Sequence, residues 1–275
     1  MRNIPSSILL CILVYLPGIS FAADALREHF SMGIVPQQNP TLIAKNWAPV
    51  LRYLSEKTGY HVELHTAKDI TSFNTRVKSG IFDVVYVNPR LYAVDASANY
   101  SVFAKEQDVL LRGIIVVAKN SPITHLDALH DTTMAFPDAD AFAATLIPLA
   151  FLKKSGIHVT FKYVMSHDSV YRAVAKGLYP AGGGVIKTLE KSDPEIKELL
   201  RILWTSPPFT PHPFAAHTRV PQPVVTKLLA AMIGMEIDPV GKKLLKEIGF
   251  KGIVAAEDRE YDEIRRLKNL MLPAP

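Results

Sequence analysis

Along the chain, short apolar runs take turns with segments in which apolar residues recur every three or four positions. The first pattern predicts strands and the second predicts helices. Short apolar, β-branched runs that end at turn residues predict strands at 30–35, 60–65, 82–87, 111–118, 134–136, 159–164 and 202–205. Apolar residues that recur every three or four positions predict helices at 41–57, 70–78, 90–98, 141–155, 169–176, 186–200, 224–235, 239–248 and 261–270. Strand–helix–strand units with short loops indicate an α/β fold with doubly wound, parallel sheets.

The order of these units predicts two lobes. We expect the chain to cross from the first lobe to the second and to return through a segment with four prolines, at 207, 208, 211 and 213. The first lobe would comprise residues 23–115 and 214–275, and the second lobe residues 116–213. A cleft between two lobes permits hinge closure around a ligand.

The first 22 residues have the features of a cleaved signal peptide. Arg2 precedes an apolar run at 8–16, and Ser20 and Ala22 are the small residues expected before a cut after Ala22. The run is short for a membrane span, although an uncleaved anchor is the alternative. Cleavage removes Cys11, so that the mature chain would have no thiol, which suits the periplasm.

Composition and motifs narrow the functional classes. After cleavage the chain has 31 − 1 = 30 Lys and Arg against 26 Asp and Glu, a net charge of +4 without a basic block. Nucleic acid is therefore not an expected partner, whereas a small-molecule anion is compatible with the charge. Adjacent residues such as 166–168 (SHD) cannot assemble a catalytic triad, and the scattered histidines do not predict a metal site. We expect a monomer without enzyme activity, metal or cofactor.

The segment 136–148 predicts a strand end, a short loop and a helix start. Asp138 or Asp140 can cap the helix, and small side chains leave its first N–H groups approachable. A helix N-terminus of this kind can hold a small anion. The alternative is an ordinary buried helix start whose aspartates already satisfy its dipole.

A series of short motifs is spread over nearly the whole mature chain: GIVP at 33–36, WAP at 47–49, TG at 58–59, GIFD at 80–83, NPRLY at 88–92, FPD at 136–138 with Pro148 ten residues on, SHD at 166–168, GF at 249–250 and YD at 261–262. In order and spacing these motifs resemble those of the phosphonate-binding (phosphate/phosphite/phosphonate) periplasmic proteins of ABC importers. The resemblance implies a type-II periplasmic binding protein, with two doubly wound α/β lobes around a cleft and an ABC permease as partner. A periplasmic sensory subunit of a membrane signalling system is the alternative role.

The helix start departs from the family pattern. In the family it usually reads Ser-Thr-Ser-Gly, and those hydroxyls and amides cradle the phosphonate; this chain has Ala141, Phe142, Ala143 and Ala144 there. Each hydrogen bond to a charged ligand is worth roughly 1.5–3 kcal/mol, so we expect phosphonates to bind poorly. Phe142 either faces an organic group of the ligand or packs in the core. Pro180 replaces an aspartate that can meet a ligand amine.

Loops at the carboxyl ends of strands supply the other expected ligand contacts, because ligands of such sheets lie there. His167 can donate to an anion, while Asp168 is alternatively a helix cap and Tyr86 a core aromatic. The residues predicted to bind the ligand are Gln37, Tyr86, Asn88, Ala141, Phe142, Ala143, Ala144, Ser166, His167 and Asp168.

Overall fold

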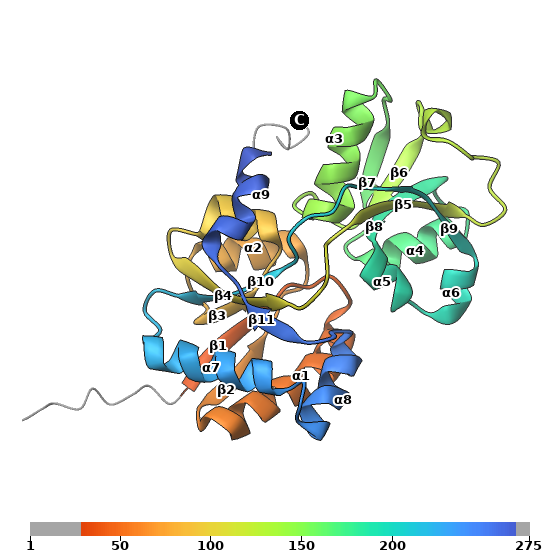
Figure 1. Cartoon of the computed structure of the whole chain (residues 1–275). Helices are drawn as coiled ribbons and strands as arrows, with labels where there is room; N and C mark the ends of the chain where they lie inside the picture. The colour runs from red at the N-terminus through yellow and green to blue at the C-terminus, as the bar shows by residue number, and fades with distance from the viewer. Residues whose placement is uncertain (1–28, 268–275) are drawn as a thin grey trace, which may run out of the picture.

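The computed structural model describes residues 29–267 and contains two β-sheets, each with helices on both faces (Figure 1). The six-stranded sheet has the order β11-β4-β10-β3-β1-β2, and the five-stranded sheet has the order β7-β6-β8-β5-β9. The predicted signal peptide and Cys11 lie outside the described residues. The α/β class and the two doubly wound units are confirmed.

The first sheet combines parallel and antiparallel pairs. β1 runs parallel to both β2 and β3, whereas β4 runs antiparallel to β10 and β11. The carboxyl ends of β1 and β3 therefore lie at the same edge, and the loops with Gln37 and Asn88 start there. The strands are β1 (His29–Ile34), β2 (His61–His65), β3 (Val84–Tyr86), β4 (Tyr100–Glu106), β10 (Pro213–His217) and β11 (Ile253–Ala255).

The second sheet comes from the middle of the chain. β6 runs parallel to β7 and β8, and β5 runs antiparallel to β8 and β9. The chain enters this sheet at β5 and rejoins the first sheet at β10; the exact lobe boundaries stay a prediction. The strands are β5 (Gly113–Ala118), β6 (Thr133–Phe136), β7 (Thr160–Tyr163), β8 (Ala181–Val185) and β9 (Leu200–Thr205).

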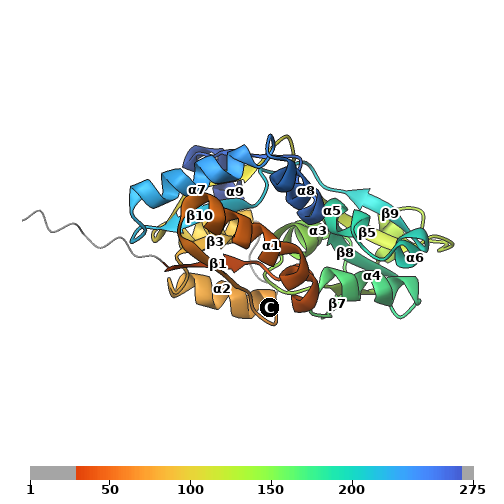
Figure 2. The same cartoon turned by 90° about the horizontal axis from the view of Figure 1, so that it is seen from below.

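Helices cover the two faces of each sheet (Figure 1). On the first sheet, one face carries α1 (Pro40–Thr58), α7 (Gln222–Gly234) and α8 (Pro239–Ile248), and the other carries α2 (Ile70–Lys78), the π-helical turn η1 (Leu91–Ala96), the 3-10 turn η4 (Asp258–Tyr261) and α9 (Asp262–Arg266). On the second sheet, the π-helical turn η3 (Phe142–Leu146) and α3 (Ile147–Lys154) lie opposite α4 (His167–Ala175), α5 (Ile186–Glu190) and α6 (Pro194–Glu198). Residues Leu126–Leu129 form a 3-10 turn, η2, before β6. In Figure 2, α8 of the first unit reaches toward α5 of the second.

Local signals explain why the first long helix was predictable. The Asn39 side chain accepts the N–H of Leu42, Pro40 opens α1, and Gly59 ends it with a φ of 76°. α1 accommodates Pro49 without breaking. The helix consequently presents an apolar face, including Trp47, toward the first sheet and the cleft.

Four strands, β4, β8, β10 and β11, were not predicted, and the segment 186–200 forms two short helices, α5 and α6, instead of one. β10 begins at the last proline of the predicted connector, a position where proline is tolerated because it opens the strand. β11 has only three residues, too few to show a period. Pro194 starts α6 and so ends any continuous helix before it.

Candidate ligand-binding site between the two sheets

A helix start lies between the two sheets, as the sequence predicts. β6 ends at Phe136, and the chain then enters η3, whose cap residue Ala141 has an extended conformation and makes no side-chain cap. The opening N–H groups of a helix have no partner within the helix, and its dipole favours negative charge there. A side chain on Gly113 would place its Cβ 2.0 Å from the Ala143 carbonyl oxygen, so this glycine allows the helix start to pack against β5.

The aspartates before this helix bind the opposite unit, so the predicted caps are wrong. The Asp138 carboxylate accepts the Thr71 hydroxyl at 2.8 Å and the Thr71 N–H at 3.2 Å, at the N-terminus of α2. Asp140 accepts the Asn74 side-chain amide at 3.3 Å. Because α2 belongs to the first unit, these bonds join the two units and leave the N–H groups at the start of η3 uncapped by side chains.

A small cavity of about 10 Å³ lies at this helix start, with room for roughly one water. Seven of its lining residues are among those predicted to bind the ligand, and the remainder are mainly apolar. The cavity is lined by Val35, Gln37, Ile70, Asn88, Ala141, Phe142, Ala143, Ala144, His167, Val185 and His212. Asn88 is 4% exposed, and among the described residues its side-chain nitrogen has no hydrogen-bond partner, although its oxygen accepts the N–H of Leu91 at 2.8 Å.

Two buried histidines flank the small cavity without adding charge. His167 Nδ1 lies 2.8 Å from the Thr188 hydroxyl, and burial lowers the pKa of His167 to about 4. His212 Nε2 lies 3.0 Å from the Gln37 side-chain nitrogen, and burial lowers the pKa of His212 to about 3, with nearby Lys187 contributing. At neutral pH both rings are uncharged and can still donate a hydrogen bond.

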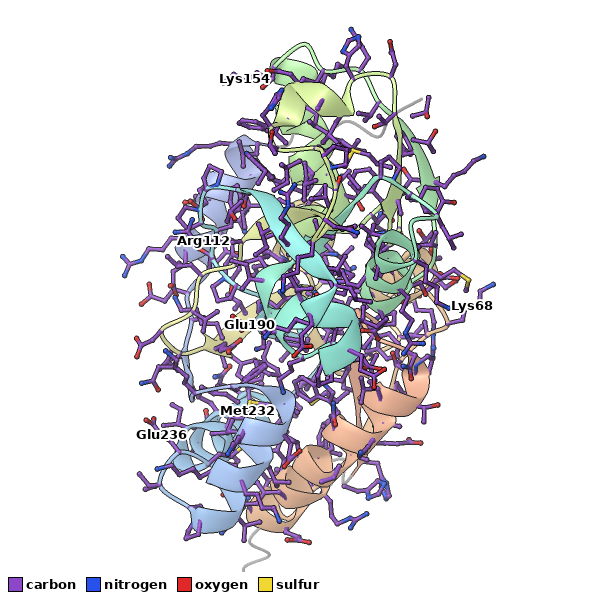
Figure 3. The ribbon with its side chains drawn as sticks, turned by 90° about the vertical axis from the view of Figure 1, so that its right-hand side faces the viewer. Lys68, Arg112, Lys154, Glu190, Met232 and Glu236 are labelled. Atoms are coloured by element: carbon purple, nitrogen blue, oxygen red, sulfur yellow. The ribbon has the colours of Figure 1, made fainter. Side chains whose placement is uncertain are left out.

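A second cavity of about 280 Å³ adjoins the first. The two share four lining residues, Val35, Gln37, Val185 and His212. One wall of the larger cavity is aromatic: the ring centroids of Trp47 and Tyr86 are 5.2 Å apart, and those of Tyr86 and Phe250 are 5.8 Å apart. Figure 3 shows Arg112 and Glu190, two further lining residues, in the middle of the molecule between its upper and lower halves.

Charged side chains from both units meet in the larger cavity. Lys187 of α5 donates to the carboxylate of Glu106, the last residue of β4, at 2.5 Å, and its Nζ lies 3.8 Å from the centre of the Phe250 ring. Glu106 is 3% exposed; burial raises its pKa and lowers that of Lys187. Lys191 donates to the Glu247 carbonyl at the end of α8 at 2.6 Å. Because Glu106 belongs to the first unit and Lys187 to the second, their ion pair joins the two units across the cleft.

The structure brings most of the predicted residues together. Tyr86 lines the larger cavity and packs against Phe214, with ring centroids 4.7 Å apart. Ser166 and Asp168 line neither of the two cavities: Ser166 caps α4 by accepting the N–H of Ser169 at 3.1 Å, so the predicted cap at Asp168 is wrong. Assignment of ligand contacts to all these residues stays a prediction.

Several cavity residues were missed by the sequence reasoning. His212 lies in the segment rich in proline, and Glu106 and Lys187 are 81 positions apart, so nothing in the sequence links them. Trp47 and Phe250 lie within the family motifs WAP at 47–49 and GF at 249–250, and this was the only sequence signal that could have pointed to them as cavity residues.

Comparison with known proteins decides the family. A family model described as "ABC transporter, phosphonate, periplasmic substrate-binding protein" matches residues 32–261. The chain belongs to this family. This confirms the resemblance and the transport role, and the relatives give no support to the sensory alternative.

Individual relatives of this phosphonate-family protein agree with the assignment. The "Phosphate-import protein PhnD" of Mycolicibacterium smegmatis is 23% identical, over 90% of this chain and 87% of its own. Two solved structures share the fold. A binding protein component of an ABC phosphonate transporter from Pseudomonas aeruginosa has a TM-score of 0.79 and 19% identity, with 88% of this chain and 86% of that chain covered. PhnD1 from Prochlorococcus marinus, in complex with methylphosphonate, has a TM-score of 0.78 and 21% identity, with coverage of 89% and 99%.

The type-II periplasmic binding fold is thus established for this phosphonate-family protein. The family is periplasmic, its members are transport proteins that work with an ABC permease, and it is not an enzyme class. Within residues 29–267 no helix has the length and apolar character to cross a bilayer. In the same part of the chain, no three His, Cys, Asp or Glu side chains are grouped so that they could hold a metal ion.

Proposed function

We propose that this protein captures a small phosphonate- or phosphate-like anion in the periplasm and presents it to an ABC permease. The chain would be exported with its signal peptide cut after Ala22 and would act as a monomer without a cofactor, nucleic acid or catalysis. Its lobes, residues 23–115 with 214–275 and residues 116–213, would part to admit the anion and close around it.

The observation that carries the proposal is the uncapped start of η3 beside the Asn88 side-chain nitrogen. Both supply buried N–H donors that face a cavity between the units, and neither is neutralised by a carboxylate. The neutral imidazole of His167 adds a further donor. An oxyanion is the group that such a set of donors favours, because N–H groups at a helix start combine hydrogen bonding with the dipole.

The affinity for phosphonates is expected to be low. Ala141, Phe142, Ala143 and Ala144 contribute no hydroxyls, so that main-chain amides, Asn88 and His167 would hold the anion. Two or three missing bonds of roughly 1.5–3 kcal/mol each correspond to several orders of magnitude in the dissociation constant.

Isothermal titration of the mature protein with phosphate, phosphite, methylphosphonate and 2-aminoethylphosphonate tests the proposal. We expect measurable binding of at least one anion, weaker than nanomolar. Nanomolar binding of any of them would contradict the low affinity, and no binding of any at millimolar concentration would contradict anion capture.

A matched variant tests the site. Asn88→Asp keeps the side-chain oxygen that accepts the N–H of Leu91 and replaces the unpartnered nitrogen by a second, anionic oxygen. Because residue 88 is 4% exposed, the buried carboxylate should lower the thermal midpoint, and the folded variant should lose at least tenfold in anion affinity. Unchanged affinity would remove Asn88 from the binding site.

A further inference from the structure

The two adjoining cavities differ greatly in size. The cavity at the helix start has about 10 Å³, whereas its neighbour has about 280 Å³, close to the range of 300–1,000 Å³ typical of sites for organic ligands. Gln37 and His212 line both, and they contact each other at 3.0 Å. A ligand whose anionic group lies at the helix start therefore has space for a larger substituent on the far side of this contact.

The wall of the larger cavity suits a flat apolar group. Trp47, Tyr86 and Phe250 are each at most 8% exposed and form a contiguous aromatic surface from the first unit. Ile186 of α5 faces the same cavity from the second unit. Because the walls come from both units, closure of the lobes would enclose a substituent and remove its apolar surface from water.

The charges around the larger cavity favour an anionic ligand as a whole. Its lining includes four basic residues (Arg112, Lys187, Lys191 and Lys251) and two acidic residues (Glu106 and Glu190), a balance of 4 − 2 = +2. Glu106 is already paired with Lys187. A ligand whose substituent carries a cation would be repelled by this excess of positive charge, whereas an uncharged substituent would not be repelled.

We propose that the cavity of about 280 Å³ holds the organic body of the ligand, and that the protein selects oxyanions with a flat apolar substituent, such as an aryl group, over inorganic phosphate and methylphosphonate. This inference rests on the proposed capture of an anion at the helix start. It also explains the departure from the hydroxyl-rich helix start: burial of the substituent replaces part of the affinity that the missing hydroxyls would supply.

Two ligands with the same head group test the inference. Methylphosphonate and phenylphosphonate differ only in the substituent, and we expect phenylphosphonate to bind at least tenfold more tightly in isothermal titration. In Ile186→Phe a larger side chain narrows the cavity, and the phenylphosphonate advantage should fall below threefold. The control Ile202→Phe changes a residue that is 42% exposed on β9, and it should keep the full advantage.

A second measurement reports on the place of binding if Ile186→Phe folds poorly. The chain has two tryptophans, so in a Trp204→Phe background Trp47 is the only one that fluoresces. Saturating phenylphosphonate should shift or quench the Trp47 emission, and methylphosphonate should change it much less.

Each outcome bears on a different claim. Equal binding of the two ligands, or tighter binding of methylphosphonate, overturns the inference and leaves anion capture standing. A phenylphosphonate advantage that persists in a folded Ile186→Phe protein, or that leaves the Trp47 emission unchanged, also overturns it, because the substituent then lies elsewhere. Binding of neither ligand overturns the proposed anion capture and the inference with it.

Discussion

Replacing Ala143 with serine should increase the affinity for small phosphonates. Ala143 is 4% exposed, lies in the first turn of η3 and lines the small cavity, where the family usually has a serine. The cavity of about 10 Å³ has room for roughly one water, so the anion enters only when the two units part, and residue 143 then lies on the wall that the anion contacts. The new hydroxyl would donate to the ligand beside the opening amides of the helix.

The expected size of the effect follows from the charge of the ligand. A hydrogen bond to a charged group contributes roughly 1.5–3 kcal/mol, which corresponds to a roughly tenfold to hundredfold lower dissociation constant for methylphosphonate. Without ligand the same hydroxyl is buried and lacks a strong acceptor, so the free energy of unfolding should fall by about 1–3 kcal/mol. Added methylphosphonate should restore this loss, because a ligand that binds only the folded state stabilises it.

The assay is isothermal titration with methylphosphonate, paired with thermal denaturation with and without ligand. Ala150→Ser is the matched control: it adds the same hydroxyl on α3, outside both cavities, and should leave the affinity unchanged. If Ala143→Ser leaves the affinity unchanged or weakens it while the protein stays folded, the anion is not held at the helix start.

Three further predictions concern the stability and closure of the protein. The folded pKa of about 4 for His167 lies below its unfolded value of about 6.5, so the unfolded state takes up a proton first as pH falls and the folded state loses stability. The free energy of unfolding, measured with denaturant, should fall by about 2 kcal/mol between pH 7 and pH 5 because of this residue. His167→Gln should reduce this dependence of stability on pH. Asp138→Ala removes both bonds to Thr71 across the cleft and should raise the radius of gyration of the ligand-free protein in small-angle scattering; an unchanged radius would argue against this contact as a latch. Gly113→Ala places a Cβ 2.0 Å from a carbonyl oxygen and should cost at least about 1–3 kcal/mol, whereas Gly234→Ala, with nothing within 4 Å, should not destabilise; equal effects in thermal denaturation would contradict the packing.

Helices with clear local signals were predictable from the sequence. α2 matches the expected range 70–78 and α8 matches 239–248, because each combines an apolar period with a capping aspartate, Asp69 and Asp238. The strands β4, β8, β10 and β11 were not predictable in the same way. All four are held by pairing with distant segments. In addition, β8 is mostly glycine, β10 begins with proline and β11 has three residues, so these three show little period of their own.

The site was predictable where strand ends determine it. Gln37, Asn88 and the segment 141–144 follow parallel strands, and the structure places all of them around one cavity. Asp138 was predicted to cap the helix that follows it, because the sequence cannot show that its carboxylate instead meets Thr71 at the start of α2 in the other unit. The ion pair of Glu106 and Lys187 likewise depends on how the two sheets face each other, which no local pattern encodes.

The central claim is that main-chain amides at the start of η3 hold an anion between the two units. Amide chemical shifts of the ¹⁵N-labelled protein, recorded during titration with methylphosphonate, test it most directly. The account predicts the largest saturable changes at the N–H groups of residues 142–144 and at the side-chain amide of Asn88. Saturable changes at other residues, with the chemical shifts of these four groups unchanged, would contradict it.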